Sequence, residues 1–206
     1  MSGGYFCDRC RSCAALLGLA ALMLLAGCAD DRWHGKDISG LMPELEFELI
    51  DENGQAVTEQ MFAGRPLAMY FGFTHCPDIC PTTLARLTAA VRQLPAPVRE
   101  RLELAFVSVD PARDDPSQLA RYTDAFGEKL LGLTGSQRQL RQITRRYRIT
   151  YGYEEPDAEG HYEVSHSSAI FVFDRQHKSR LMLLDSLSVE QMRQDLERLL
   201  VATAGS

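Results

Sequence analysis

The sequence predicts an α/β fold in which helices flank a central mixed sheet. Two nearly continuous apolar runs, 67–73 and 102–109, read as buried strands, and each is followed by a helical pattern. Near the C-terminus two further strands, 169–173 and 180–184, are joined by a short turn and are followed by a last amphipathic helix. Strands that alternate with helices and then form a terminal hairpin are typical of a sheet with both parallel and antiparallel pairs.

Each remaining element has a local signal. Residues 45–50 alternate apolar and acidic side chains before the turn residues 51–54, so an N-terminal hairpin is expected. Asp115, Ser136 and Ser188 stand where N-cap residues are expected. The expected helices cover 81–94, 116–126, 136–147 and 188–201, a short strand covers 130–133, and a polar hairpin is inserted at 151–165.

The N-terminus has the pattern of an export signal. Arg9 and Arg11 precede the apolar stretch 14–26, which suits a signal-peptide core of about 7–15 residues better than a membrane span of about 20. The small residues before Cys28 resemble a bacterial lipoprotein signal, in which this cysteine is lipidated; an uncleaved membrane anchor is the alternative. We therefore expect a signal peptide or anchor at 1–27, a tether at 28–43, and one domain at 44–206, exported and membrane-anchored on the periplasmic side of a bacterial membrane.

Composition limits the function classes. Hydrophobic residues make up 45% and charged residues 24% of the 206 residues, which excludes a disordered, collagen-like or multi-span membrane chain. The net charge of −6, without a basic stripe, argues against nucleic acid as a partner. Cys7, Cys10 and Cys13 are spaced like zinc ligands but lie in the expected signal peptide.

Cys76 and Cys80 form the most informative pair. They lie where a buried strand ends and a helix begins, and ligand sites of α/β sheets are found at the carboxyl ends of strands. A helix N-terminus favours thiolates and lowers their pKa. On a helical turn, residues four apart have Cβ atoms about 5–6 Å apart. This separation suits one soft metal ion and is also near the range of a disulfide, so metal binding, redox cycling and an inert disulfide all remain open.

A histidine is the natural third ligand for such a pair. Two thiolates suit Cu(I), and an imidazole would complete a trigonal site. Of the five histidines, His166 directly precedes a buried strand and would approach Cys76 if the two strands run antiparallel. An ordinary loop histidine is the alternative. A structural zinc site normally has four protein ligands, and only three candidates are present here.

Three motifs together resemble the Sco (SenC) family of copper proteins. They are residues 70–83 around the cysteines, 107–111 and 164–168, and the resemblance extends over residues 38–202. It implies a thioredoxin-like fold that binds Cu(I), and also Cu(II), through Cys76, Cys80 and His166, with Asp110 supporting the site from nearby.

The resemblance also implies a function and a partner. Members of the family help to assemble the dinuclear copper centre of cytochrome c oxidase, so the expected partner is a membrane-bound cuproprotein. The protein would act as a copper metallochaperone. A thiol–disulfide oxidoreductase, or thiol peroxidase, that uses Cys76 and Cys80 as its redox pair is the alternative. Family members often have a transmembrane anchor, whereas Cys28 predicts a lipid.

Overall fold

The computed structural model describes residues 32–127, 129–155, 162 and 164–202, which belong almost entirely to the second of two compact units, Trp33–Ser206. An eight-stranded mixed sheet with the order β1-β10-β9-β4-β5-β6-β2-β3 forms its centre, and β7 and β8 pair in a separate hairpin. The strands are β1 (Lys36–Asp37), β2 (Glu48–Asp51), β3 (Ala56–Thr58), β4 (Leu67–Gly72), β5 (Glu103–Ser108), β6 (Leu130–Thr134), β7 (Tyr151–Tyr153), β8 (Val164–His166), β9 (Ile170–Phe173) and β10 (Ser179–Leu183).

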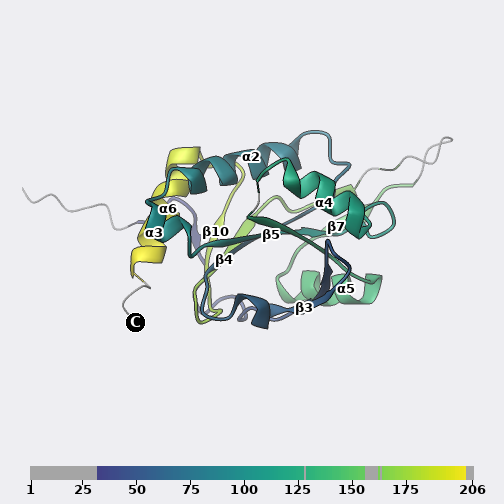
Figure 1. The fold of residues 1–206 in the computed structure, drawn as a ribbon, viewed down its shortest axis with the longest axis horizontal. Helices are drawn as coiled ribbons and strands as arrows, with labels where there is room; N and C mark the ends of the chain where they lie inside the picture. Colours follow the sequence, from purple (N-terminus) through teal and green to yellow (C-terminus); the bar gives the residue numbers. More distant parts are fainter. Residues whose placement is uncertain (1–31, 128, 156–161, 163, 203–206) are drawn as a thin grey trace, which may run out of the picture. The chain divides into compact units, whose positions relative to one another are not determined.

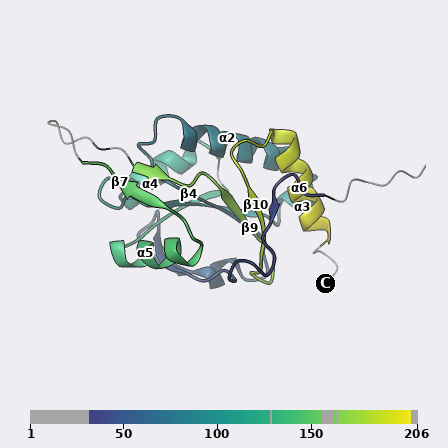
Figure 2. The ribbon, with the colours of Figure 1, turned by 180° about the vertical axis from the view of Figure 1, so that it is seen from behind.

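Helices cover both faces of the sheet. α2, α4 and α6 lie on one side, and α5 lies on the other (Figure 1, Figure 2). The helices are η1 (Glu59–Phe62), α2 (Ile79–Arg92), α3 (Ala96–Arg99), α4 (Pro116–Asp124), α5 (Gln137–Arg146) and α6 (Val189–Ala202). The predicted α/β class is therefore confirmed, including the N-terminal hairpin β2–β3 and the inserted hairpin β7–β8.

The centre of the sheet determines where functional side chains gather. All six residues of β4 are buried, as the apolar run predicts. β4, β5 and β6 run parallel, and Gly72 pairs with Ser108 at the last position of β4 and β5. β9 runs antiparallel to β4 on its other side. The residues that follow β4 and β5 therefore leave the same edge of the sheet side by side.

The predicted helix caps are present. Asp115 accepts a hydrogen bond from Gln118 N at 2.8 Å, and Ser188 accepts one from Gln191 N at 3.2 Å. Ser136 forms a capping box with Gln139. These contacts satisfy backbone N–H groups that the first turn of a helix leaves without intrahelical partners, so the sequence locates these three helix starts within one residue.

The segment before the domain differs from expectation. Residues 28–43 are expected to be a tether, yet β1 lies within them and pairs antiparallel with β10. His34 N and Gly35 N donate to the buried carboxylate of Asp195 at 3.1 and 2.7 Å, and Ile38 is buried. A two-residue strand is too short to produce a periodic pattern, so the sequence gives no signal for it.

The expected signal peptide, 1–27, and Cys28 lie outside the described residues. Among the residues that are described, no helix has both the length and the apolar character needed to cross a bilayer.

Candidate functional site

The two cysteines lie in the turn between β4 and α2. Cys76 is 8% exposed, Cys80 is fully buried, and neither cysteine forms a disulfide. Cys76 N donates to Phe73 O at 3.3 Å, which closes the turn. Cys80 N donates to Cys76 Sγ at 3.4 Å, so the sulfur of the first cysteine accepts a hydrogen bond from the first turn of α2. The dithiol therefore lies at the carboxyl end of a central strand, where the sequence predicts it.

The two thiols have different surroundings. Cys76 Sγ accepts a hydrogen bond from the amide at the start of α2 and lines the cleft. Burial raises the pKa of the Cys80 thiol, and the neighbouring Cys76 raises it further. The expectation that the helix lowers the pKa is therefore wrong for Cys80, because loss of solvent around a fully buried thiol outweighs the helix dipole.

Close packing holds Cys80 against β4. A Cβ atom added to Gly72 would lie 2.7 Å from Cys80 Sγ and 2.8 Å from Phe106 Cε2. Only a residue without a side chain fits at this position while the sulfur keeps its place. Gly72 thus admits the second sulfur into the core directly beneath the turn that carries the first.

Asp114, in the loop that follows β5, supports the turn and was not predicted from the sequence. Its fully buried carboxylate accepts hydrogen bonds from Thr74 N at 2.8 Å and from Thr74 Oγ1 at 2.7 Å. Ser108 Oγ donates to it at 2.5 Å, and His75 Nδ1 lies 3.3 Å from it. The signal in the sequence is an acidic residue shortly after β5, whose end adjoins the end of β4.

A cleft of about 360 Å³ opens beside Cys76. One wall is the turn, from Phe73 to Ile79, and the other is formed by Val164 and Ser165 of β8. The next residue of β8 is His166, whose backbone pairs with Tyr151. The side chain of His166 lies outside what the structure describes. The backbone of the predicted third ligand is thus adjacent to the wall that faces the dithiol.

No cluster of three His, Cys, Asp or Glu side chains suited to a metal ion is found among the described side chains, a set that does not include His166. The described part of the chain therefore contributes two thiols to the candidate site. Soft sulfur donors select a soft ion such as Cu(I), and they fit it better than Mg²⁺ or Ca²⁺.

Asp110 lies at the end of β5, fully buried. Its carboxylate accepts hydrogen bonds from Arg113 Nε at 2.5 Å and from Tyr162 Oη at 2.8 Å. Asp110 N donates to Ser108 Oγ at 3.1 Å. These contacts connect Asp110 to the residues that precede β8.

One further candidate residue lines the cleft, and the others lie elsewhere. Asp78, directly before α2, is part of the cleft wall and accepts a hydrogen bond from Thr82 Oγ1 at 3.2 Å. His34 Nε2 lies 2.9 Å from Gln194 Oε1, and His177 Nε2 lies 3.1 Å from Phe62 O, so both rings contact other elements. His161 and the N-terminal cysteines at positions 7, 10, 13 and 28 lie outside the described residues.

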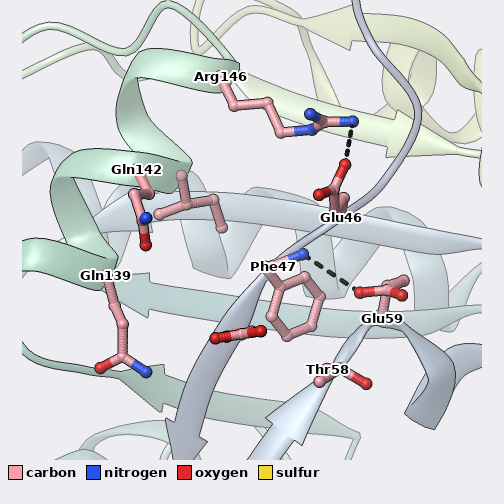
Figure 3. A pocket seen from close by; sticks show the side chains of 9 residues that line it. Glu46, Phe47, Thr58, Glu59, Gln139, Gln142 and Arg146 are labelled. Carbon is pink, nitrogen blue, oxygen red and sulfur yellow. Dashed lines mark hydrogen bonds and ion pairs between the residues drawn. The ribbon is translucent and has the colours of Figure 1, made fainter.

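A larger cavity of about 500 Å³ lies away from the cysteines, between β2, β3 and α5 (Figure 3). Arg146 pairs with Glu46 at 2.8 Å, and Phe47 N donates to Glu59 at 3.3 Å. Its lining contains no sulfur or imidazole donor, so it is not the site that the cysteines predict. The lining residues are Glu46, Phe47, Glu48, Thr58, Glu59, Gln139, Gln142, Ile143 and Arg146.

Comparison with solved structures identifies the fold. The copper-bound structure of ScoI from Arabidopsis thaliana superposes with a TM-score of 0.71 at 32% identity, over 77% of this chain and 98% of that one. The solution structure of apo Sco1 from Thermus thermophilus gives a TM-score of 0.73 at 33% identity, over 84% of this chain and 99% of that one. The thioredoxin-like fold implied by the resemblance is therefore confirmed.

Sequence comparison identifies the family. The mitochondrial SCO2 homologue of Mus musculus is 36% identical over 191 residues, which cover 90% of this chain and 75% of the relative. The chain spans between 46% and 75% of the lengths of the mitochondrial SCO2 homologues that it matches. The sequence model of the SCO1/SenC family matches residues 41–201. The chain therefore belongs to the SCO1/SenC family.

Proposed function

We propose that this protein is a copper metallochaperone in which Cys76, Cys80 and His166 hold one Cu(I) ion. The observation that carries the proposal is the cleft between the reduced dithiol and β8, the strand that ends at His166. Copper is bound in solved family members from Arabidopsis thaliana and Bradyrhizobium japonicum, which are each 32% identical to this chain. Cu(II), which accepts imidazole and thiolate together with an oxygen ligand, is the second ion expected to bind.

The position of Cys76 supports release of the ion as well as its capture. Cys76 lines the cleft, whereas Cys80 is enclosed by Gly72 and Phe106. An incoming cysteine of a client would approach from the cleft and exchange first with the accessible sulfur. Three ligands would leave one side of Cu(I) open, so a cysteine of the client could bind the ion before the chaperone's own ligands dissociate from it. Oxidation of the two thiols to a disulfide would remove both sulfur ligands and thereby stop loading.

The proposed client is the copper subunit of cytochrome c oxidase, in which the protein would help to assemble the dinuclear centre. Family membership supports this client. A structurally similar Sco protein is named as a cytochrome c oxidase assembly protein with a disulfide switch, but at 20% identity it supports only the fold. Deletion of the gene should lower oxidase activity, and restoration by added copper would favour metal delivery over thiol reduction.

The ligand set is tested by substituting the histidine. His166→Ala should lower Cu(I) affinity about tenfold or more, measured by competition with a chromophoric chelator, and should leave the reactivity of the dithiol intact. His34→Ala is the matched control, since His34 contacts Gln194 on α6. Wild-type Cu(I) affinity in His166→Ala would refute the assignment. A Zn(II) complex tighter than the Cu(I) complex at one equivalent would favour a structural zinc site instead.

A thiol–disulfide oxidoreductase is the second candidate, and the unequal burial of the thiols favours it. Cys76 is the accessible nucleophile with an amide donor at its sulfur, and Cys80 lies next to it to resolve a mixed disulfide. The protein dithiol would become a disulfide while a client disulfide accepts two electrons and two protons. This activity needs no imidazole, so reduction of a client disulfide that survives in His166→Ala, together with unchanged Cu(I) affinity, would favour it.

We further propose that the domain is exported to the periplasmic side and anchored by lipid on Cys28. The apolar segment 14–26 and the small residues before Cys28 support this proposal. Cys28→Ala should release the protein from the membrane fraction, and mass spectrometry should find the lipid on Cys28. A membrane-bound Cys28→Ala variant would instead indicate an uncleaved anchor.

A further inference from the structure

Two tyrosines attach the hairpin that carries His166 to the end of β5. Tyr153, on β7, donates a hydrogen bond from its hydroxyl to the carbonyl of Val109. Tyr162, which precedes β8, donates from its hydroxyl to the carboxylate of Asp110 at 2.8 Å. Val109 and Asp110 are consecutive residues directly after β5. Both sides of the hairpin are therefore tied to one point at the carboxyl edge of the sheet.

Arg113 makes the contact with Tyr162 extensive. Its Nη1 donates to Tyr162 O at 3.0 Å, and its guanidinium carbon lies 3.7 Å from the centre of the Tyr162 ring. Its Nε donates to Asp110 at 2.5 Å, so Asp110 receives a hydrogen bond from each of the two stacked side chains. A planar guanidinium forms such stacked and forked contacts, whereas a lysine ammonium does not.

The same arginine also approaches the other wall of the cleft. Its guanidinium carbon lies 5.7 Å from the centre of the Phe73 ring, and Phe73 lines the cleft together with Cys76. Arg113 thus contacts the aromatic ring beside the dithiol on one side and the hairpin on the other.

The hydroxyl of Tyr162 remains a donor at physiological pH. Burial, together with the hydrogen bond to Asp110, raises the pKa of Tyr162 to about 12. Asp110 is a fully buried carboxylate, and such a group is stable only when hydrogen-bond donors compensate its charge. Loss of the Tyr162 hydroxyl would leave Asp110 with one side-chain donor fewer and would weaken the attachment.

The hairpin has little stability of its own, and besides this attachment it packs on the core through buried Val164 and half-buried Tyr151. At its base Ser167 N donates to Thr150 O at 3.0 Å, and His166 pairs with Tyr151. Each strand has only three residues. An isolated two-stranded hairpin is marginally stable at best in water, so contacts with the domain must determine where its residues lie.

We propose that Tyr162 and Arg113 are positioning residues, which hold the hairpin so that His166 is preorganised to meet the metal bound by Cys76 and Cys80. The inference rests on the proposed function, because it requires His166 to be a ligand. Neither residue touches the copper ion in this arrangement. The effect of the Tyr162 hydroxyl on copper binding is transmitted through the hairpin to His166.

A double-mutant cycle tests the proposal. Tyr162→Phe removes one hydroxyl and keeps the ring on Arg113. It should weaken Cu(I) binding about threefold or more in the wild-type background, by less than His166→Ala does. In the His166→Ala background the same substitution should change Cu(I) affinity less than about twofold, because the ligand that it positions is gone. The alkylation rate of the dithiol should not change in either background.

Two further variants complete the experiment. Tyr151→Phe is the matched control on the same hairpin, since in the described part of the chain its hydroxyl has no hydrogen bond, and it should bind Cu(I) like wild type. Arg113→Lys keeps the positive charge but loses the planar group that stacks on Tyr162 and the separate N–H donors to Asp110 and Tyr162 O. It should reproduce the loss of Cu(I) affinity expected for Tyr162→Phe. Urea unfolding of each variant establishes that the compared proteins are folded.

The outcomes distinguish the proposed ligand set from the positioning role of Tyr162 and Arg113. If His166→Ala binds Cu(I) like wild type, the proposed ligand set is wrong and the positioning role is lost with it. If His166→Ala weakens binding but Tyr162→Phe and Arg113→Lys do not, the ligand set stands and the positioning role is refuted. An equal loss from Tyr162→Phe in both backgrounds would also overturn it, because the hydroxyl would then act on the dithiol.

Discussion

Replacing Gly72 by alanine tests the packing that places Cys80. The new Cβ would lie 2.7 Å from Cys80 Sγ and 2.8 Å from Phe106 Cε2, and real Cβ atoms essentially never approach other atoms within 3.0 Å. Extra atoms in a well-packed core typically cost about 1–3 kcal/mol. The smaller conformational freedom of alanine in the unfolded chain returns about 0.4–1 kcal/mol. Taken at the middle of each range, about 2 and about 0.7 kcal/mol, Gly72→Ala should therefore lower the free energy of unfolding by about 1.3 kcal/mol.

The same substitution should weaken copper binding. To restore an ordinary contact the sulfur must move by about 0.7 Å, which exceeds the tolerance of about 0.5 Å for a preorganised site. We expect Cu(I) affinity to fall about fivefold or more in competition with a chelator, and urea unfolding measures the stability. Gly152→Ala is the control, because its Cβ would meet only Ser165 Oγ at 3.5 Å.

Two results would refute this reasoning. Wild-type stability in Gly72→Ala would mean that Cys80 and Phe106 do not fill the space above Gly72. A loss of stability with wild-type Cu(I) affinity would mean that the contact with Gly72 does not determine where the Cys80 sulfur lies in the copper complex.

Three further predictions concern groups around the cleft. Asp114→Asn should lower the free energy of unfolding, measured in urea, by about 2–4 kcal/mol, because the buried carboxylate accepts hydrogen bonds from Thr74 and Ser108. Unchanged stability would mean that these hydrogen bonds do not stabilise the turn. In the reduced protein, iodoacetamide should label Cys76 about tenfold faster than the fully buried Cys80, as peptide mass spectrometry would measure, and equal rates would contradict their unequal exposure. Since the folded-state pKa of Tyr162 lies above the ordinary value of 10, its stabilising contribution should be complete below pH 10 and lost as the pH rises through about 12. The difference between the 295 nm titrations of wild type and Tyr162→Phe reports this ionisation, and a midpoint near 10 would contradict the hydrogen bond to Asp110.

The sequence predicted the elements whose signals are local. The apolar run 67–73 and the caps at Asp115 and Ser136 each depend on a few neighbouring residues, and all appear in the structure. β1 and α3 were missed because two and four residues carry too little periodicity. Local pattern therefore locates the strand and the helix that flank the dithiol, but not every edge of the sheet.

The contacts that shape the cleft could not be predicted from local sequence patterns. Asp114 meets Thr74 across 40 positions of sequence, and Arg113 meets Tyr162 across 49. Such pairs become visible only when parallel pairing has placed the ends of β4 and β5 together. His166 was a candidate from its place before a buried strand as well as from the resemblance to a family, whereas Asp110 came from the resemblance alone. The hydrogen-bond partners of Asp110 could be found only in the fold.

One segment after β5 contacts both walls of the cleft and contributes no sulfur or imidazole. Ser108 Oγ accepts a hydrogen bond from the backbone amide of Asp110 at 3.1 Å and donates one to the carboxylate of Asp114 at 2.5 Å, so one hydroxyl joins the backbone of Asp110 to the side chain of Asp114. Asp114 holds the turn that carries Cys76, and Asp110, with Arg113, holds the hairpin that carries His166. Buried polar groups of this kind are stable only when each has its hydrogen-bond partners, and Ser108 supplies one to each of these two residues. On the proposed ligand set, the relative position of the dithiol and His166 therefore depends on the segment that follows β5 as much as on the elements that carry these residues.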